Sequence, residues 1–221
     1  MRVVVFGATG MVGQAVLREC LADGRITEVL TVGRRPAPQQ HPKLIQLVTP
    51  DLFDLSGIAD RLVGLDACLY CLGVSSVGMK EPAYRRVTYD LTISIAGVLV
   101  PRNPELVFEY VSGEGTDSSE QGRTMWARVK GATENAVTAR PGGYAIRPGF
   151  IQPLPGVRSR TPLYAALYRL SGVLYPVLRR LIPSKLLTSD QLARAMVRIA
   201  IERPQQRIWN SADLAALAGR R

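Results

Sequence analysis

The feature that most constrains the fold of this chain is the segment VVVFGATGMVGQAVL near its beginning. It places Gly7, Gly10 and Gly13 between a short apolar run and a segment with helical spacing. In a strand-turn-helix context, three such glycines are a strong indication of a pyrophosphate-binding loop. Gly7 would permit the tight turn, Gly10 would let the pyrophosphate approach the backbone, and Gly13 would let the helix pack closely on the strand.

The first turn of the expected helix would face the bound anion. Its backbone amides have no partner inside the helix and lie at the positive end of the helix dipole. The residues concerned are Thr9, Gly10, Met11 and Val12. The sequence therefore predicts a dinucleotide site, the alternative being glycines that only turn a corner.

Short apolar runs alternate with helix-period segments along the chain, a pattern typical of a parallel sheet covered on both faces. We expect strands at Arg2–Phe6, Glu28–Val32, Leu44–Val48, Ala67–Cys71, Leu106–Val111 and Tyr144–Arg147. We expect helices near Met11–Asp23, Ser56–Val63, Tyr84–Val100 and Ser119–Ala139. Because crossovers in such units are right-handed, the predicted fold is α/β, a doubly wound parallel sheet of the Rossmann type with a small C-terminal helical cap.

The C-terminal part is expected to cover the substrate side of this single domain, residues 1–221. Leucines between Leu163 and Ile182 have helical spacing, broken at Pro176, which predicts a helical segment over about residues 152–188. The alternative is an oligomer contact, as in a homodimer. The following LTSDQLARAMVRIAI predicts an amphipathic helix with a serine or aspartate cap.

The end of the second strand indicates which dinucleotide is bound. An NAD site usually has an acidic residue there, whereas this chain has Arg34 and Arg35. A guanidinium binds phosphate with two parallel hydrogen bonds, so NADP (NADPH) is the predicted cofactor. Asp51 and Leu52 follow the third strand, where Asp51 could accept from the adenine amino group or serve in a turn.

Composition excludes several other classes of function. The formal net charge is +10, but the arginines are scattered and no nucleic-acid motif accompanies them, so no nucleic-acid partner is expected. Cys68 and Cys71 lie in an expected strand with their side chains on opposite faces, and His41 is the single histidine, so no metal site is predicted. The short apolar run after Arg2 is no signal peptide, and no stretch is long enough to span a membrane, so a cytoplasmic protein is expected.

Taken in order, the motifs GATGMVG, GRR, CLGVSS, VSGEG, VKG and IRPGFI resemble those of the atypical short-chain dehydrogenase/reductase family. The resemblance is greatest to its small NADP-binding, Tat-interacting-protein-like and epimerase-like branch. It implies that Cys71, Leu72 and Gly73 pass beside the adenosine and ribose, and that Lys130 holds the nicotinamide ribose hydroxyls. It also implies that Pro148, Gly149, Phe150 and Ile151 flank the carboxamide.

Two departures from the family pattern concern the reaction. The family's enzymes have a tyrosine four residues before the lysine, where this chain has Trp126, and an indole cannot donate a proton as a phenol does. They also have a hydroxyl residue where this chain has Gly113, next to Ser112. Ser112, Glu114 and Tyr89 are the remaining candidates for proton transfer beside Lys130. Trp126 is expected to lie against the nicotinamide or, alternatively, to pack away from it.

Three functions follow from these features, and whether the chain is an enzyme stays open. The first is an NADP-dependent oxidoreductase acting on a small carbonyl or alcohol substrate. The second is a non-catalytic NADP-binding regulatory or sensor protein. The third is a sugar-epimerase-like isomerase, which would need an acid/base pair that the sequence does not identify.

Overall fold

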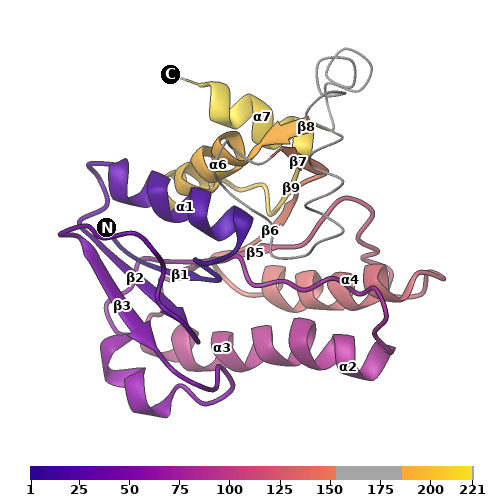
Figure 1. Ribbon diagram of the computed structural model, residues 1–221. Coiled ribbons are helices and arrows are strands. Elements are labelled where there is room, and N and C mark those ends of the chain that lie inside the picture. Colours follow the sequence, from indigo (N-terminus) through magenta and orange to yellow (C-terminus); the bar gives the residue numbers. More distant parts are fainter. Residues whose placement is uncertain (153–185, 221) are drawn as a thin grey trace.

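Residues 1–152 and 186–220 of a computed structural model are described. They form a seven-stranded parallel sheet in the order β3-β2-β1-β4-β5-β6-β9 (Figure 1). The strands are β1 (Arg2–Phe6), β2 (Glu28–Gly33), β3 (Leu44–Val48), β4 (Ala67–Tyr70), β5 (Val107–Val111), β6 (Gly143–Arg147) and β9 (Ile208–Asn210). A separate parallel pair joins β7 (Phe150–Gln152) to β8 (Leu186–Thr188). The order reverses between β1 and β4, as in a Rossmann sheet.

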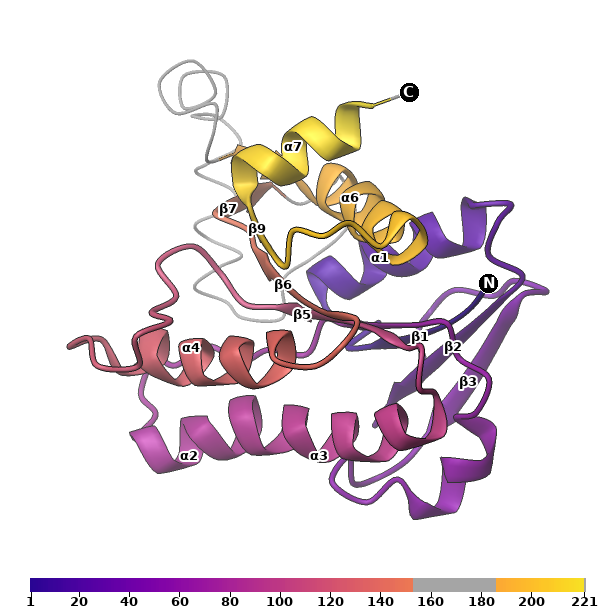
Figure 2. The ribbon, with the colours of Figure 1, turned by 180° about the vertical axis from the view of Figure 1, so that it is seen from behind.

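Helices cover both faces of the sheet (Figures 1 and 2). One layer contains α1 (Met11–Ala22), α6 (Ser189–Glu202) and α7 (Ser211–Gly219). The other contains α2 (Glu81–Arg85), α3 (Leu91–Leu99) and α4 (Met125–Thr138), with a π-helical turn, Arg86–Asp90, between α2 and α3. Short 3-10 helices span Ser56–Arg61 and Val100–Arg102.

The strands are apolar on both faces because each face carries a core. In β1, Val3 and Val5 pack with α1 and α6, whereas Val4 and Phe6 pack in the second core with α3. A continuous apolar run is what a parallel strand between two helical layers requires. The same alternation puts Cys68 in one core and Cys71 against the other, which confirms that their side chains lie on opposite faces of the sheet.

The doubly wound fold is confirmed, and the six predicted strands agree with the structure to within one residue at each end. Helix boundaries were less accurate. The expected helix Ser119–Ala139 begins only at Met125, because Asp117 accepts hydrogen bonds from the amides of Ser119 and Gly122 and holds a turn there.

Four further differences concern the other helices and the C-terminal part. The segment expected as a helix over Ser56–Val63 is the 3-10 helix Ser56–Arg61, and the expected helix Tyr84–Val100 begins at Glu81 and contains the π turn. The cap of α6 is Thr188, which forms a capping box with Gln191, in place of the expected serine or aspartate. β7, β8, β9 and α7 were not predicted, and the two described ends of the segment expected to be helical over about residues 152–188 are strands, Gln152 in β7 and Leu186–Thr188 in β8. The rest of that segment, including Leu163–Ile182, lies outside the described residues.

No helix in the described ranges combines the length and hydropathy that crossing a membrane requires. Within the same ranges, no three His, Cys, Asp or Glu side chains gather in a way that could hold a metal ion.

Candidate functional site

The glycine loop between β1 and α1 has the geometry that its sequence predicts. Gly7 has a positive φ of 81°, and a Cβ atom there would lie 2.8 Å from the backbone of Cys71. A Cβ atom on Gly13 would lie 2.1 Å from the carbonyl oxygen of Gly7, so α1 packs directly on the turn. The amide of Gly10 donates to the Gly7 carbonyl at 2.9 Å, which closes the loop.

The beginning of α1 is suited to an anion. Gly10 is the N-cap and no side chain caps the helix, so the amides of the first turn lack a capping oxygen. They also lie at the positive end of the helix dipole. These features fit the pyrophosphate of a dinucleotide.

Arg34 and Arg35 lie at the same edge of the sheet as this loop. β1 and β2 are parallel, with Phe6 opposite Val32, so the residues after Gly33 follow their strand just as Gly7 follows β1. Both arginines are exposed. The position therefore suits a phosphate on the adenosine ribose.

Asp51 and Leu52 have structural contacts of their own. Asp51 is exposed, and its carboxylate accepts a hydrogen bond from the amide of Phe53 at 2.9 Å, as in a turn. Leu52 is 8% exposed and belongs to the core that also contains Leu47. Of the two roles expected for Asp51, the structure therefore supplies a contact for the one in a turn.

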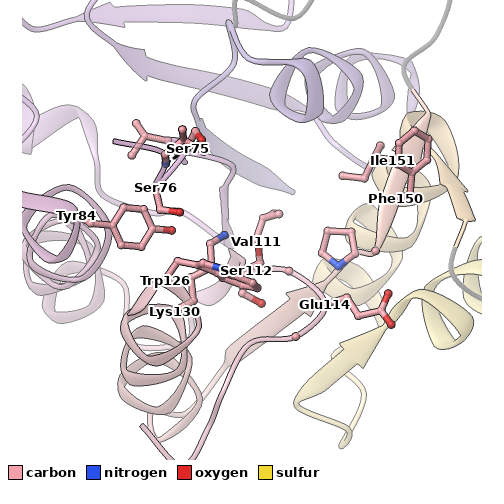
Figure 3. Close-up of a pocket in the computed structure, with 16 residues that line it drawn as sticks. Ser75, Ser76, Tyr84, Val111, Ser112, Glu114, Trp126, Lys130, Phe150 and Ile151 are labelled. Atoms are coloured by element: carbon pink, nitrogen blue, oxygen red, sulfur yellow. Dashed lines mark hydrogen bonds between the residues drawn. The ribbon is translucent and has the colours of Figure 1, made fainter. Parts of the chain in front are cut away.

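A pocket of about 750 Å³ lies where β4, β5 and β6 end (Figure 3). Its lining consists of Val74, Ser75, Ser76, Val77, Tyr84, Val111, Ser112, Gly113, Glu114, Gly115, Trp126, Lys130, Pro148, Gly149, Phe150 and Ile151. The structure thus brings together the motifs after three strands and the first half of α4. The predicted residues Cys71, Leu72 and Gly73 are continuous with the Val74–Val77 wall.

Lys130 is the cation of this pocket. The residue is half-buried, and its ammonium donates to the backbone carbonyl of Ser112. Loss of hydration lowers the pKa of this ammonium to about 8, although the negative charge of Glu134 acts in the opposite direction. The neighbouring Gly131 is required for packing, since a Cβ atom there would lie 1.7 Å from the carbonyl oxygen of Asp117.

Trp126 lines the pocket one helical turn before Lys130. The loop after β5 lies against its indole, because a Cβ atom on Gly115 would be 3.3 Å from the ring. Gly115 also has a positive φ of 83°, a conformation that favours glycine. The indole therefore occupies space between this loop and α4, as the prediction of a pocket-facing tryptophan requires.

Ser112 lines the pocket, but its hydroxyl belongs to a buried polar network. It donates to the carboxylate of Glu134 and lies 3.1 Å from the carbonyl oxygen of Ile146. Glu134 is fully buried and accepts two hydrogen bonds of 2.9 Å from the Nε of Arg147. The Ser112 hydroxyl is therefore occupied, which counts against the expected part in proton transfer.

The structure separates the other two candidates for proton transfer. Glu114 lines the pocket, and its carboxylate points away from Trp126 and Lys130 (Figure 3). Tyr89 lies on the π turn, with the guanidinium of Arg85 4.2 Å from its ring centre, and it is not among the described residues that line the pocket. The expected role of Tyr89 thus has no support in the geometry.

Sequence reasoning missed several residues that build this site. Ser75 and Ser76 were noted only as part of a motif, although their position after a central strand could have placed them here. Tyr84 was noted only as the beginning of a helix, and Glu134 was not considered. Ser211, whose hydroxyl accepts from the amide of Gly149 at 2.6 Å and fixes the loop after β6, left no recognisable signal.

The fold and the glycine loop define a dinucleotide-binding protein of the Rossmann type. A family model described as the NAD dependent epimerase/dehydratase family matches residues 3–134, which is more than half of the chain. The chain belongs to this family. Its members use NAD or NADP, and the resemblance to short-chain dehydrogenases/reductases is confirmed.

Solved structures of that class share the fold. A short-chain dehydrogenase/reductase from Saccharomyces cerevisiae is 16% identical, with a TM-score of 0.68 over 99% of this chain and 98% of its own. Uronate dehydrogenase from Agrobacterium tumefaciens is 16% identical, with a TM-score of 0.65 over 96% and 76% of the two chains. A Bordetella bronchiseptica enzyme in complex with NAD+ is 16% identical, with a TM-score of 0.66 over 97% and 76%.

Proposed function

We propose that this chain is an NADP-dependent oxidoreductase that acts on a small carbonyl or alcohol substrate. The observation that carries the proposal is the half-buried ammonium of Lys130 in a pocket at the same sheet edge as the glycine loop. A binding site for a dinucleotide and a pocket for a second molecule are thereby adjacent, as a transfer between the two requires.

The preference for NADP over NAD rests on Arg34 and Arg35. Their exposed guanidiniums would bind the phosphate that distinguishes the two cofactors, and no acidic residue follows β2 to bind the ribose hydroxyls instead. The amides at the beginning of α1 would hold the pyrophosphate. When bound, the reduced cofactor supplies a hydride.

The chain's own residues would orient the partners and exclude water. The Lys130 ammonium would donate to the nicotinamide ribose hydroxyls, and Pro148 to Ile151 would flank the carboxamide. Trp126 and Phe150 supply aromatic surface on the pocket wall. The hydroxyls of Ser75, Ser76 and Tyr84 would bind the polar end of the substrate.

Turnover tests this proposal. Consumption of NADPH and of NADH is followed by absorbance with a panel of aldehydes, ketones and quinones. We expect at least one compound to be reduced, and faster with NADPH than with NADH. A protein that binds neither cofactor, or that reduces compounds faster with NADH, would contradict the proposal.

The second candidate is a non-catalytic NADP sensor. It is favoured by the indole of Trp126, which replaces a phenol, and by the occupied hydroxyl of Ser112. Tight NADPH binding with no turnover of any compound in the panel, in both the wild type and Trp126→Tyr, would favour this function. Appearance of reduction in Trp126→Tyr alone would show a reductase pocket that lacks only its acid.

A further inference from the structure

We propose that the phenol of Tyr84 gives the proton to the substrate oxygen, in place of the tyrosine that Trp126 replaces. This inference rests on the proposed oxidoreductase function. The proton donor would then lie on α2 and not on α4. These two helices belong to the same layer and pack against each other.

The position of Tyr84 in the pocket supports this role. Tyr84 is 1% exposed, yet it lines the pocket together with Trp126 and Lys130. Its hydroxyl points toward the side of the pocket where these two residues lie (Figure 3). Among the described lining residues it is the single tyrosine.

The helix that carries Tyr84 is built to hold it there. The buried residues Tyr84, Thr88 and Thr92 follow one another at intervals of four, and the π turn Arg86–Asp90 lies between the first and the last. An α-helix has about 3.6 residues per turn, so a stripe with this spacing would drift around a regular helix. The wider π turn between Tyr84 and Thr92 reduces this drift, and such turns often occur at functional sites.

The other groups in the pocket are less suited to give a proton. The indole of Trp126 is a hydrogen-bond donor only, and the Ser112 hydroxyl already donates to Glu134. The Glu114 carboxylate points away. Ser75 and Ser76 have alcohol hydroxyls, which ionise less readily than a phenol. They can orient a substrate oxygen, but a phenol is the better acid.

Lys130 lines the same pocket as Tyr84, and its ammonium can return a proton to the phenolate after the transfer. The other titratable groups near Tyr84 are Glu114 in the pocket lining, Glu134 behind Lys130, and Tyr110 on β5. Glu134 is paired with Arg147. Lys130 is thus the one cation among the described pocket residues.

The proposed reaction is the reduction of a carbonyl compound to an alcohol. A hydride with its two electrons passes from a reduced nicotinamide to the carbonyl carbon and forms a C–H bond. The C=O π bond breaks, and its electron pair takes the proton from the O–H of Tyr84. The product is an alcohol, the nicotinamide is oxidised, and the phenolate of Tyr84 regains a proton from Lys130 or from water.

Kinetics with a defined probe, phenanthrenequinone, test the proposal, and a wild type that binds NADPH without reducing this probe would count against it. Calorimetry first establishes that NADPH binds, and a failure here would count against the proposed function itself. Tyr84→Phe should then bind NADPH with an affinity within about threefold of wild type, but lower kcat by about 100-fold or more with little change in KM. Tyr144→Phe, which removes a phenol at the opposite edge of the sheet, should retain the wild-type kcat. A kcat of Tyr84→Phe within about threefold of wild type would overturn the proposal.

A second measurement needs no turnover. Tyrosines labelled with carbon-13 at Cζ are observed by NMR in the wild type during titration with NADP⁺, with Tyr84→Phe used to assign the resonance. The Tyr84 resonance should shift to saturation, because its phenol lines the pocket that the nicotinamide would enter. An unchanged Tyr84 resonance in a protein that binds NADP⁺ by calorimetry would place the phenol away from the reacting groups and would overturn the inference, whereas absence of NADP⁺ binding would count against the proposed function itself.

Discussion

The two parts of this sheet edge are built by different means. The part around β1 and β2 depends on backbone geometry: Gly7 and Gly13 approach other main-chain atoms so closely that no side chain fits. The part around β5 and β6 depends on buried polar side chains, with Ser112, Glu134 and Arg147 forming a network behind the pocket. A site formed by the backbone needs glycines at fixed spacing. A site formed by side chains can be assembled from several helices and strands.

This difference has a consequence for function. The glycine loop offers little freedom for change, because Gly7 and Gly13 are required by close contacts with the backbone and Gly10 by the space that a pyrophosphate would need. A proton donor needs only an acidic hydrogen in the right volume, and a neighbouring helix can supply it. We therefore expect substitutions in the glycine loop to weaken cofactor binding by filling space. Substitutions behind the pocket should instead lower stability by leaving a buried charge unpaired.

The largest effect is expected from Arg147→Met. Glu134 is fully buried, and removing its cation would leave an unpaired carboxylate in the protein interior. The free energy of unfolding should fall by about 3 kcal/mol, as measured by urea denaturation at neutral pH. Arg123→Met, at an exposed position, is the control and should change it by less than about 0.5 kcal/mol. Equal losses in the two variants would show that the network does not stabilise the pocket.

Gly10→Val tests the backbone part. A Cβ atom at this position lies 3.3 Å from the Gly7 carbonyl oxygen, which the fold can accommodate, but the larger side chain would fill the volume that the pyrophosphate needs. NADPH affinity should fall by about 100-fold or more by calorimetry, which is about 2.7 kcal/mol. Gly24→Val is the matched control, since a Cβ atom there meets no atom within 4 Å. A folded Gly10→Val protein with wild-type affinity would remove the assignment of the loop.

Glu109→Gln concerns a buried acid. Glu109 lies on β5 between Leu69 and Tyr144, and neither of its carboxyl oxygens has a hydrogen bond to another residue that the structure describes. Burial raises the pKa of the carboxyl well above 4.5. The folded state therefore holds a proton that the unfolded state releases, so stability should fall as the pH rises above 4.5.

Glutamine resembles the protonated acid, so Glu109→Gln should lose this part of the pH dependence. At neutral pH it should be more stable than the wild type by about 2 kcal/mol. Thermal unfolding at a series of pH values measures both quantities. Parallel pH profiles for the two proteins would show that Glu109 does not titrate in this range.

The smallest effect is expected from Arg34→Ala. Loss of one charge-assisted contact to the phosphate should weaken NADPH binding by about tenfold, which is about 1.4 kcal/mol. NADH lacks that phosphate, so its affinity should stay the same and serves as the control within one calorimetric series. An equal loss for both cofactors would place Arg34 elsewhere on the dinucleotide, and no loss for either would remove it from the site.

The sequence predicted the structure best where a short continuous segment determines the local conformation. The glycine spacing around Gly10 and the apolar runs identify the loop, the strands and the fold, since both signals are local. The end of α4 was also placed well, but its beginning at Met125 depends on the turn held by Asp117, a side-chain contact that periodicity does not report.

The pocket was predicted less completely because it depends on contacts between distant segments. Lys130, Trp126 and the loop after β6 were found from motifs, whereas Tyr84 comes from another helix and is directed by a π turn that leaves no simple signal. Tyr89, five residues later, was chosen in its place. The occupied state of the Ser112 hydroxyl also depends on Glu134 and Arg147, which no local pattern connects to it.

The central claim is that NADPH binds with its nicotinamide end beside Trp126 and Lys130. Trp126 and Trp209 are the two tryptophans of the chain, so Trp209→Phe leaves one indole as a reporter. We predict that titration of this variant with NADPH changes the Trp126 fluorescence to saturation, with the dissociation constant that calorimetry gives, and that the additional change Trp126→Phe abolishes the signal. Calorimetric binding of NADPH without any change in Trp126 fluorescence would contradict the account.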